Sequence, residues 1–254
     1  MLAYQNIYAS PGNMTKGSDG NTIDAMSLNR IDGIIASLKD ESYQPKPSRR
    51  TYIPKKNGKK RPLGIPSFDD KLVQECVRLL LEAIYEGSFA KTSHGFRPNH
   101  SCHTALSQVQ VNFTGVKWFV EGDIKGFFDN IDHDVMIHIL AERIKDERFL
   151  RLIRKFLKAG YLEDWVYHNT YSGTPQGGII SPILANIYLD KLDCFVEKLK
   201  AEFDLGAQRA IHPVSYKLAM KHGTLAKKLR NSNSEEERKI LAEQLRAIEK
   251  ERIH

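Results

Sequence analysis

A carboxylate at the end of an apolar run is the feature that most restricts how this chain can fold. The stretch FVEGDIKGFFDNIDH, residues 119–133, places Asp123 where the apolar run stops and a glycine and two phenylalanines begin. An acid at the end of a buried strand is costly unless a helix N-terminus, a basic side chain or a metal ion pairs with it. We therefore expect a strand over Lys117–Ile124 and a partner for the Asp123 carboxylate elsewhere in the fold.

The composition is that of a globular chain with excess positive charge. The 254 residues are 41% hydrophobic and 27% charged, which is enough to bury a substantial core. Lysine and arginine together number 38 against 31 acids, a formal net charge of +7. This balance suggests a polyanionic partner.

Two stretches without any acid carry much of this charge, residues 42–68 and residues 205–234. For the second stretch, a solvated face and a nucleic-acid contact are equally consistent with the pattern. For the first we predict contacts with RNA phosphates, made by Lys46, Arg49, Arg50, Lys56, Lys59 and Lys60.

Cysteine content and hydropathy indicate in which cellular compartment the protein is expected. Cys76, Cys102 and Cys194 are too few and too scattered for a disulfide framework, which indicates a reducing compartment such as the cytoplasm. His100 and His103 flank Cys102 without a second ligand pair, so no zinc site is predicted. No apolar run approaches membrane-spanning length and the N-terminus lacks the layout of a signal peptide, so we expect a cytoplasmic protein with no membrane partner.

Apolar periodicity predicts a chain rich in helices, with one hairpin. Asn57-Gly58 lies between two short extended runs and is typical of a hairpin tip. Asp132 and Ser181-Pro182 are typical helix starts. Helices are predicted over residues 23–38, 73–84, 101–111, 135–144, 149–157, 184–192 and 235–252.

Several motifs, in a fixed order after the basic loop, carry a family resemblance. They are Arg97-Pro98, the DIKGFF motif at 123–128 and the TPQGG motif at 174–178. In this order they resemble the reverse transcriptases encoded by group II introns, which also serve as splicing maturases. The resemblance covers nearly the whole chain, including the N-terminal extension SDGNTIDAMSLNRIDGIIASLKDESYQPKP.

The resemblance implies an α+β fold made of the fingers and an incomplete palm of a right-hand polymerase, with a small helical N-terminal extension. The expected boundaries are 1–45 for the extension, 46–115 for fingers, 116–135 for the palm segment with the first catalytic Asp motif, 136–173 for fingers helices, 174–200 for a palm helix and 201–254 for a basic, partly helical insertion.

For catalysis, the resemblance implies a two-ion Mg²⁺ site with Asp123 as catalytic ligand and the Ile124 carbonyl as a second ligand. Carboxylates are the ligands that this hard cation prefers. The aromatic-x-Asp-Asp hairpin that completes the site in the family is not found in these residues. Asp69-Asp70 has the wrong position and is expected to serve a helix N-terminus, while Asp129 and Asp132 are expected in turn and capping roles.

The resemblance also implies residues for the deoxynucleoside triphosphate substrate. Lys55 and Arg61 match positions that hold the triphosphate, a task that suits a lysine or a forked guanidinium. Phe128 matches the side chain that excludes a ribose 2′-hydroxyl, although core packing is its alternative role. Gln176 and Gly177 match positions beside the templating pair. A further position, Arg97, matches one near the template RNA, with loop packing as its alternative.

As a whole, the sequence predicts an RNA-directed DNA polymerase and maturase that binds group II intron RNA, an RNA template and a DNA primer. The 254-residue chain itself is expected to bind RNA without polymerising, and an unpaired sheet edge would favour a homodimer. Two alternatives remain open: a non-catalytic RNA-binding splicing cofactor, and the reverse transcriptase of a related retroelement outside introns.

Overall fold

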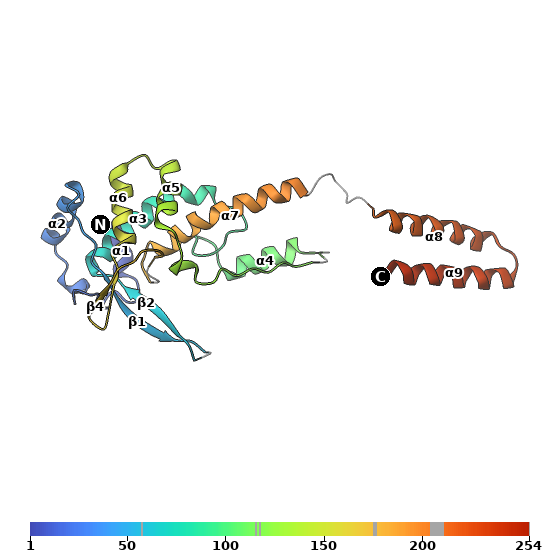
Figure 1. Ribbon diagram of the computed structural model, residues 1–254, viewed down its shortest axis with the longest axis horizontal. Helices are drawn as coiled ribbons and strands as arrows, with labels where there is room; N and C mark the ends of the chain where they lie inside the picture. The colour runs from blue at the N-terminus through green and yellow to red at the C-terminus, as the bar shows by residue number, and fades with distance from the viewer. Residues whose placement is uncertain (57, 115, 117, 175–176, 204–210, 254) are drawn as a thin grey trace. The chain divides into compact units, whose positions relative to one another are not determined.

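The structure is a computed structural model that describes residues 1–254 except 57, 115, 117, 175–176, 204–210 and 254 (Figure 1). It has the predicted α+β class, with helices and one mixed sheet among the described residues. The chain forms two compact units, Met1–Glu197 and Lys198–His254. The finer division into fingers and palm segments stays a prediction.

The sheet has four strands in the order β2-β1-β3-β4. The predicted hairpin is formed by β1 (Ser48–Pro54) and β2 (Lys60–Ile65), which pair antiparallel up to the turn (Figure 1). β3 (Tyr161–Glu163) lies parallel to β1, and β4 (Val166–His168) pairs antiparallel with β3. The sequence patterns did not predict β3 and β4, because strands of three residues are too short to show alternation.

Helices make up most of the rest of the chain. The first unit contains α1 (Leu2–Tyr8), η1 (Ile23–Ala25), α2 (Leu28–Lys39), α3 (Phe68–Tyr85), η2 (Glu86–Ser88), α4 (Cys102–Asn112), η3 (Phe127–Asp129), α5 (His133–Arg143) and α6 (Glu147–Leu157). Helix α7 (Ser181–Phe203) begins in the first unit, while α8 (Pro213–Asn231) and α9 (Glu235–Ile253) belong to the second. As predicted, Asp132 caps α5, since its Oδ1 accepts from the backbone N–H of Asp134 at 2.8 Å and of Val135 at 2.9 Å.

The main core lies among α3, α5, α6 and α7. Its most deeply buried side chains come one or two from each helix: Leu81, Met136, Leu140, Ile153, Leu157, Leu184 and Ile187. A smaller apolar cluster joins α1 to the start of α3 through Ala3, Ile7 and Phe68. Burial of these faces, rather than helix propensity, stabilises helices of this length.

A buried carboxylate, Asp70, connects the start of α3 to the chain before β1. Its oxygens accept hydrogen bonds from Tyr43 Oη at 2.7 Å, Ser67 Oγ at 2.6 Å and the Lys46 backbone N–H at 3.0 Å. Ser67 is also the N-cap of α3 and accepts from the Asp70 backbone N–H at 3.1 Å. Burial raises the pKa of Asp70, and the three donors work against that rise. Asp70 therefore has a structural role at the start of α3, where the N-cap itself is Ser67 rather than either aspartate.

The strand predicted over Lys117–Ile124 is not formed, so that prediction was wrong. Lys117 lies outside the described residues, and residues 118–124 form neither helix nor strand. Trp118 is 89% exposed and Val120 93% exposed. An extended segment becomes a strand only where a neighbour takes up its backbone hydrogen bonds, and no described segment pairs with this one.

The second unit is a helical hairpin in which α8 and α9 pack side by side (Figure 1). Among its described side chains, Leu241 is the only buried apolar residue. None of the helices in the described part of the chain is long and apolar enough to cross a bilayer.

We predict that Tyr43→Phe lowers the free energy of unfolding by ~1–3 kcal/mol at neutral pH, because it leaves a buried Asp70 oxygen without its donor. Loss of that donor should raise the already elevated pKa of Asp70 further. A raised carboxyl pKa means that ionisation opposes folding, so the deficit should shrink as pH falls and Asp70 becomes protonated. Urea unfolding at a series of pH values measures this.

Tyr52→Phe is the matched control, because the Tyr52 hydroxyl also donates to a carboxylate, that of Glu163, but on an exposed surface. It should change the unfolding free energy little at any pH. Equal deficits in the two variants, or a Tyr43→Phe deficit that does not depend on pH, would contradict the role given to Asp70.

Candidate nucleotide-binding site

The segment that carries Phe128 is held by backbone hydrogen bonds from the segment just before the TPQGG glycines. The Thr174 backbone N–H donates to the Phe128 carbonyl at 2.7 Å, and the Gly173 N–H donates to the Ile131 carbonyl at 2.7 Å. Because both bonds are made by backbone groups, they fix the main chain at Phe128 whatever side chains surround it. Phe128 itself is half-buried within η3.

Only glycine at position 173 lets this segment come so close to the Phe128 backbone. A Cβ built on Gly173 would lie 2.4 Å from the Phe128 carbonyl oxygen and 2.8 Å from Asp129 Cα, and its φ of +81° also favours glycine. The buried His133 ring donates from Nε2 to the Gly173 carbonyl at 2.7 Å, and Ser172 Oγ donates to the Asp129 carbonyl at 2.9 Å. The two segments are therefore fastened at several points.

The same stretch of chain also contacts strand β2. A Cβ on Gly177, whose φ is +109°, would lie 2.5 Å from the Gly64 carbonyl oxygen and 2.8 Å from Leu63 Cδ1. Gly177 therefore lets the chain lie against the β2 backbone. Gln176, predicted to act beside it, lies outside the described residues.

The two predicted triphosphate ligands belong to the β1–β2 hairpin. Arg61 is opposite Ile53, and the Lys55 N–H donates to the Lys59 carbonyl at 2.7 Å, which continues the ladder past the strand ends. Since side chains alternate along a strand, Lys55, Arg61 and Leu63 belong to one face of the hairpin. This is the face on which Leu63 meets Gly177.

A hollow of about 420 Å³ lies beside Phe128, lined also by Arg50, Pro62, Gly64, Asp129, Tyr161 and residues 169–174. The Arg50 guanidinium lies 3.5 Å from the centre of the Tyr161 ring. Arg50 and Pro62 belong to the hairpin face opposite Arg61, so the structure brings Phe128 next to Arg50 rather than to Lys55 or Arg61.

Two buried hydroxyls in this hollow, Thr170 Oγ1 and Thr174 Oγ1, have no hydrogen-bond partner among the residues that the structure describes. A buried polar atom without a partner is costly, and such atoms often mark where a ligand or water binds. Sequence reasoning missed Tyr161 and Thr170, since no pattern in residues 161–170 distinguishes them from an ordinary loop.

The predicted metal ligands, Asp123 and the Ile124 carbonyl, lie in the exposed segment that forms no strand. Within the described part of the chain, no three histidine, cysteine, aspartate or glutamate side chains converge as a metal site would require. A single carboxylate and a carbonyl do not fit a two-ion site, which needs carboxylates on both ions. No catalytic step through a metal follows from these residues.

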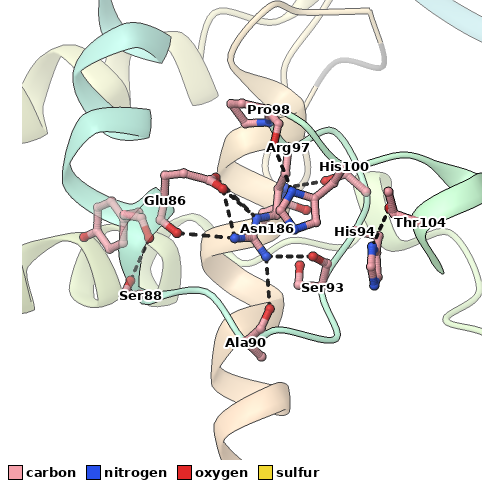
Figure 2. Close-up of polar contacts among 12 residues, drawn as sticks. Glu86, Ser88, Ala90, Ser93, His94, Arg97, Pro98, His100, Thr104 and Asn186 are labelled. Carbon is pink, nitrogen blue, oxygen red and sulfur yellow. Dashed lines mark hydrogen bonds and ion pairs between the residues drawn. The ribbon is translucent and has the colours of Figure 1, made fainter. Parts of the chain in front are cut away.

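The Arg97 side chain is hydrogen-bonded to other residues of the protein (Figure 2). Its guanidinium donates to the Glu86 carboxylate at 2.9 and 3.1 Å, to the Ala90 carbonyl at 3.0 Å and to the Ser93 carbonyl at 2.6 Å. The side chain is only 7% exposed. These contacts favour the loop-packing role that the sequence left open, because such a guanidinium has little capacity left for a template phosphate.

The residues predicted to bind RNA fall into two groups. Lys46 pairs with Asp19 at 3.0 Å, Arg49 donates to the Lys16 carbonyl, and Arg50 lies over Tyr161, so these three hold the fold together. The others are exposed at the end of the β1–β2 hairpin: Lys56, Lys59 and Lys60.

Comparison with known proteins agrees with the motifs. Residues 53–209 match the family model of the reverse transcriptase, an RNA-dependent DNA polymerase. The group II intron-encoded protein LtrA of Lactococcus lactis subsp. cremoris is 55% identical over 95% of this chain. An uncharacterized 91 kDa protein in the cob intron of Schizosaccharomyces pombe is 49% identical over 96% of it. The chain spans 41% and 30% of these two relatives, respectively.

A solved structure, the partial Cas6-RT-Cas1–Cas2 complex, aligns with 78% of this chain and 34% of its own, with 22% identity and a TM-score of 0.48. The family assignment rests on the sequence matches alone. The chain belongs to the reverse transcriptase family and is a homologue of group II intron-encoded proteins.

Proposed function

We propose that this chain forms the RNA-binding fingers and the first part of the palm of a group II intron reverse transcriptase and maturase. The observation that carries the proposal is a pair of contacts: the Thr174 N–H donates to the Phe128 carbonyl, and Gly177 lies against the Gly64 carbonyl. Together they join the segment that matches the family's sugar-selecting position to the strand that carries Arg61.

In this proposal the triphosphate of the incoming deoxynucleotide lies at Lys55 and Arg61, and its sugar lies in the hollow beside Phe128 and Arg50, on the other side of strand β2. The two cations bind phosphate oxygens. Phe128 occupies the volume that a ribose 2′-hydroxyl would need, and its position is fixed through the backbone bond from Thr174. Gly177 lies beside the base in this proposal, and Gln176 keeps the same role as a prediction from the family motif.

RNA binding is proposed for Lys56, Lys59 and Lys60, because they are exposed at the hairpin end, whereas Lys46, Arg49 and Arg50 make contacts that hold the fold together. Exposed lysines suit a phosphate backbone. In the longer protein, the partners are group II intron RNA, an RNA template and a DNA primer.

Polymerisation is proposed for the longer protein only. Mg²⁺ supplies charge neutralisation at the transferred phosphate in this family, and Asp123 is our candidate ligand once a second carboxylate is present. With Asp123 alone, this chain should bind RNA without extending a primer. A non-catalytic splicing cofactor is the alternative if the longer protein is also inactive.

We predict that replacing Lys56, Lys59 and Lys60 together with glutamine weakens RNA binding and lowers its salt dependence. Each lost phosphate contact should reduce the slope of log affinity against log salt by about 0.7–0.9. Filter-binding titrations with structured intron RNA, from low to high salt, measure both quantities.

The matched control replaces three exposed lysines that lie outside the hairpin, Lys39, Lys145 and Lys158. Its net charge changes equally, so it should leave the slope unchanged. If both triple variants lose affinity and slope to the same extent, binding depends on net charge and not on the hairpin.

We predict that Phe128→Ala in the full-length protein lowers the preference for deoxy- over ribonucleotides by about tenfold or more, because the 2′-hydroxyl gains the vacated volume. Incorporation of single nucleotides of both kinds measures the preference. Phe127→Ala is the control, because the Phe127 ring packs against Tyr188 and the core and should affect stability instead. An unchanged preference in Phe128→Ala would assign this ring to packing.

We predict that the 254-residue chain does not extend a primer on an RNA template with Mg²⁺, whereas the full-length protein does. Asp123→Ala in the full-length protein should abolish extension, since a ligand to the ions would be lost. Extension by the 254-residue chain would mean that a second carboxylate lies within it, and Asp69 or Asp70 would need to be reconsidered.

A further inference from the structure

An exposed tryptophan occupies the turn between β3 and β4. Trp165 is 90% exposed, and both turn residues adopt left-handed backbone conformations, with φ of 49° at Asp164 and 66° at Trp165. Glycine adopts this conformation without steric cost, whereas a bulky residue does not. The turn thus exposes a large apolar ring on a strained backbone, and the chain gains no burial from it.

A hollow of about 470 Å³ lies beside this indole. Its other walls come from the basic hairpin and from a glycine-rich loop near the N-terminus. They are lined by Lys16, Gly17, Ser18, Gly20, Arg49, Arg50, Leu162 and Asp164. The hollow therefore combines one aromatic face with several cations and a single acid.

The loop that forms one wall is fixed in place by contacts within the protein. Arg49 donates from Nε and Nη2 to the Lys16 carbonyl at 3.1 and 2.9 Å. Lys71 Nζ donates to the Thr15 carbonyl at 3.1 Å. A Cβ on Gly17 would lie 2.6 Å from Ser67 Cα, so the loop backbone packs directly on the start of α3. A wall held this firmly is pre-organised for a ligand.

The ammonium group of Lys16 is not used in these contacts. Only its carbonyl accepts a hydrogen bond, and its side chain lies on the exposed side of the loop. Arg49 and Arg50 add positive charge to the same hollow, while Arg50 is partly balanced by Glu163 at 3.7 Å. An anionic group next to a flat ring is the ligand that these walls complement.

We propose that Trp165 stacks on an unpaired base of bound RNA, with Lys16 at a neighbouring phosphate. Aromatic side chains beside cations bind single strands in this way, since every base has a face to stack while the phosphate meets the cation. A base inside a duplex is covered on both faces, so single-stranded RNA is preferred. The inference rests on the proposed RNA binding and adds to it a site for one unpaired nucleotide.

The sequence offers a direct optical test, because the chain has only 2 tryptophans. In Trp118→Phe, Trp165 is the single indole, and its fluorescence reports stacking. We expect quenching on titration with an oligoadenylate of about 12 nucleotides, and little quenching with a duplex of the same length. The full 254-residue chain is used throughout.

Affinity measurements separate stacking from charge. Trp165→Ala should lower affinity for the oligoadenylate by about tenfold with an unchanged salt slope, and Trp165→Phe should retain most of the affinity. Lys16→Gln should reduce the salt slope by about one. Trp118→Ala is the matched control, because Trp118 is 89% exposed but has Glu121 and Asp123 nearby in sequence, and it should leave affinity unchanged.

The outcomes distinguish this inference from the proposed function. If the wild-type chain binds oligoadenylate in a salt-dependent manner, but Trp165 is not quenched and Trp165→Ala binds equally well, the stacking site is wrong and RNA binding stands. If Trp118→Ala and Trp165→Ala lose affinity alike, the site is also wrong. If the wild-type chain binds no RNA even at low salt, the proposed function fails with it.

Discussion

Close approach of main-chain atoms at two glycines determines how the candidate site is built. Gly173 lies against the Phe128 carbonyl and Gly177 against the Gly64 carbonyl, and in both places a Cβ would overlap backbone atoms. Neighbouring side chains can rotate away from a clash, but backbone atoms inside a sheet and a turn cannot. Both approaches are therefore set by van der Waals contact between main-chain atoms, and hydrogen bonds of 2.7 Å hold the one at Phe128.

Sequence reasoning was most successful where local patterns determine structure. The Asn57-Gly58 hairpin, the Asp132 cap and the helix from Ser181 follow from turn chemistry, capping and periodicity, which act over a few residues. The strand predicted before Asp123 is not formed, and local patterns could not show this in advance. Its apolar residues fit a strand, but a strand also needs a neighbour, and that requirement is not visible in the segment itself.

Within the site, the sequence indicated which residues matter but not which residues they contact. The family motif pointed to Phe128, yet the cation beside that ring is Arg50, which had been predicted only as an RNA contact. Arg97 shows the same difference. A guanidinium near a template position suggests phosphate binding, whereas its partners Glu86, Ala90 and Ser93 come from a loop whose path no short pattern reveals. Counting positive charge therefore overstates the surface available to a nucleic acid.

At the left-handed turn of Asp164 and Trp165, the residues that would make the fold most stable differ from the residue proposed to bind RNA. Two-residue hairpin turns of this kind favour asparagine and glycine, which relieve the backbone strain at little cost. A redesign guided by thermal stability alone would choose those two residues for this turn. It would gain a more stable hairpin and, in the same step, lose the indole that distinguishes this edge of the sheet.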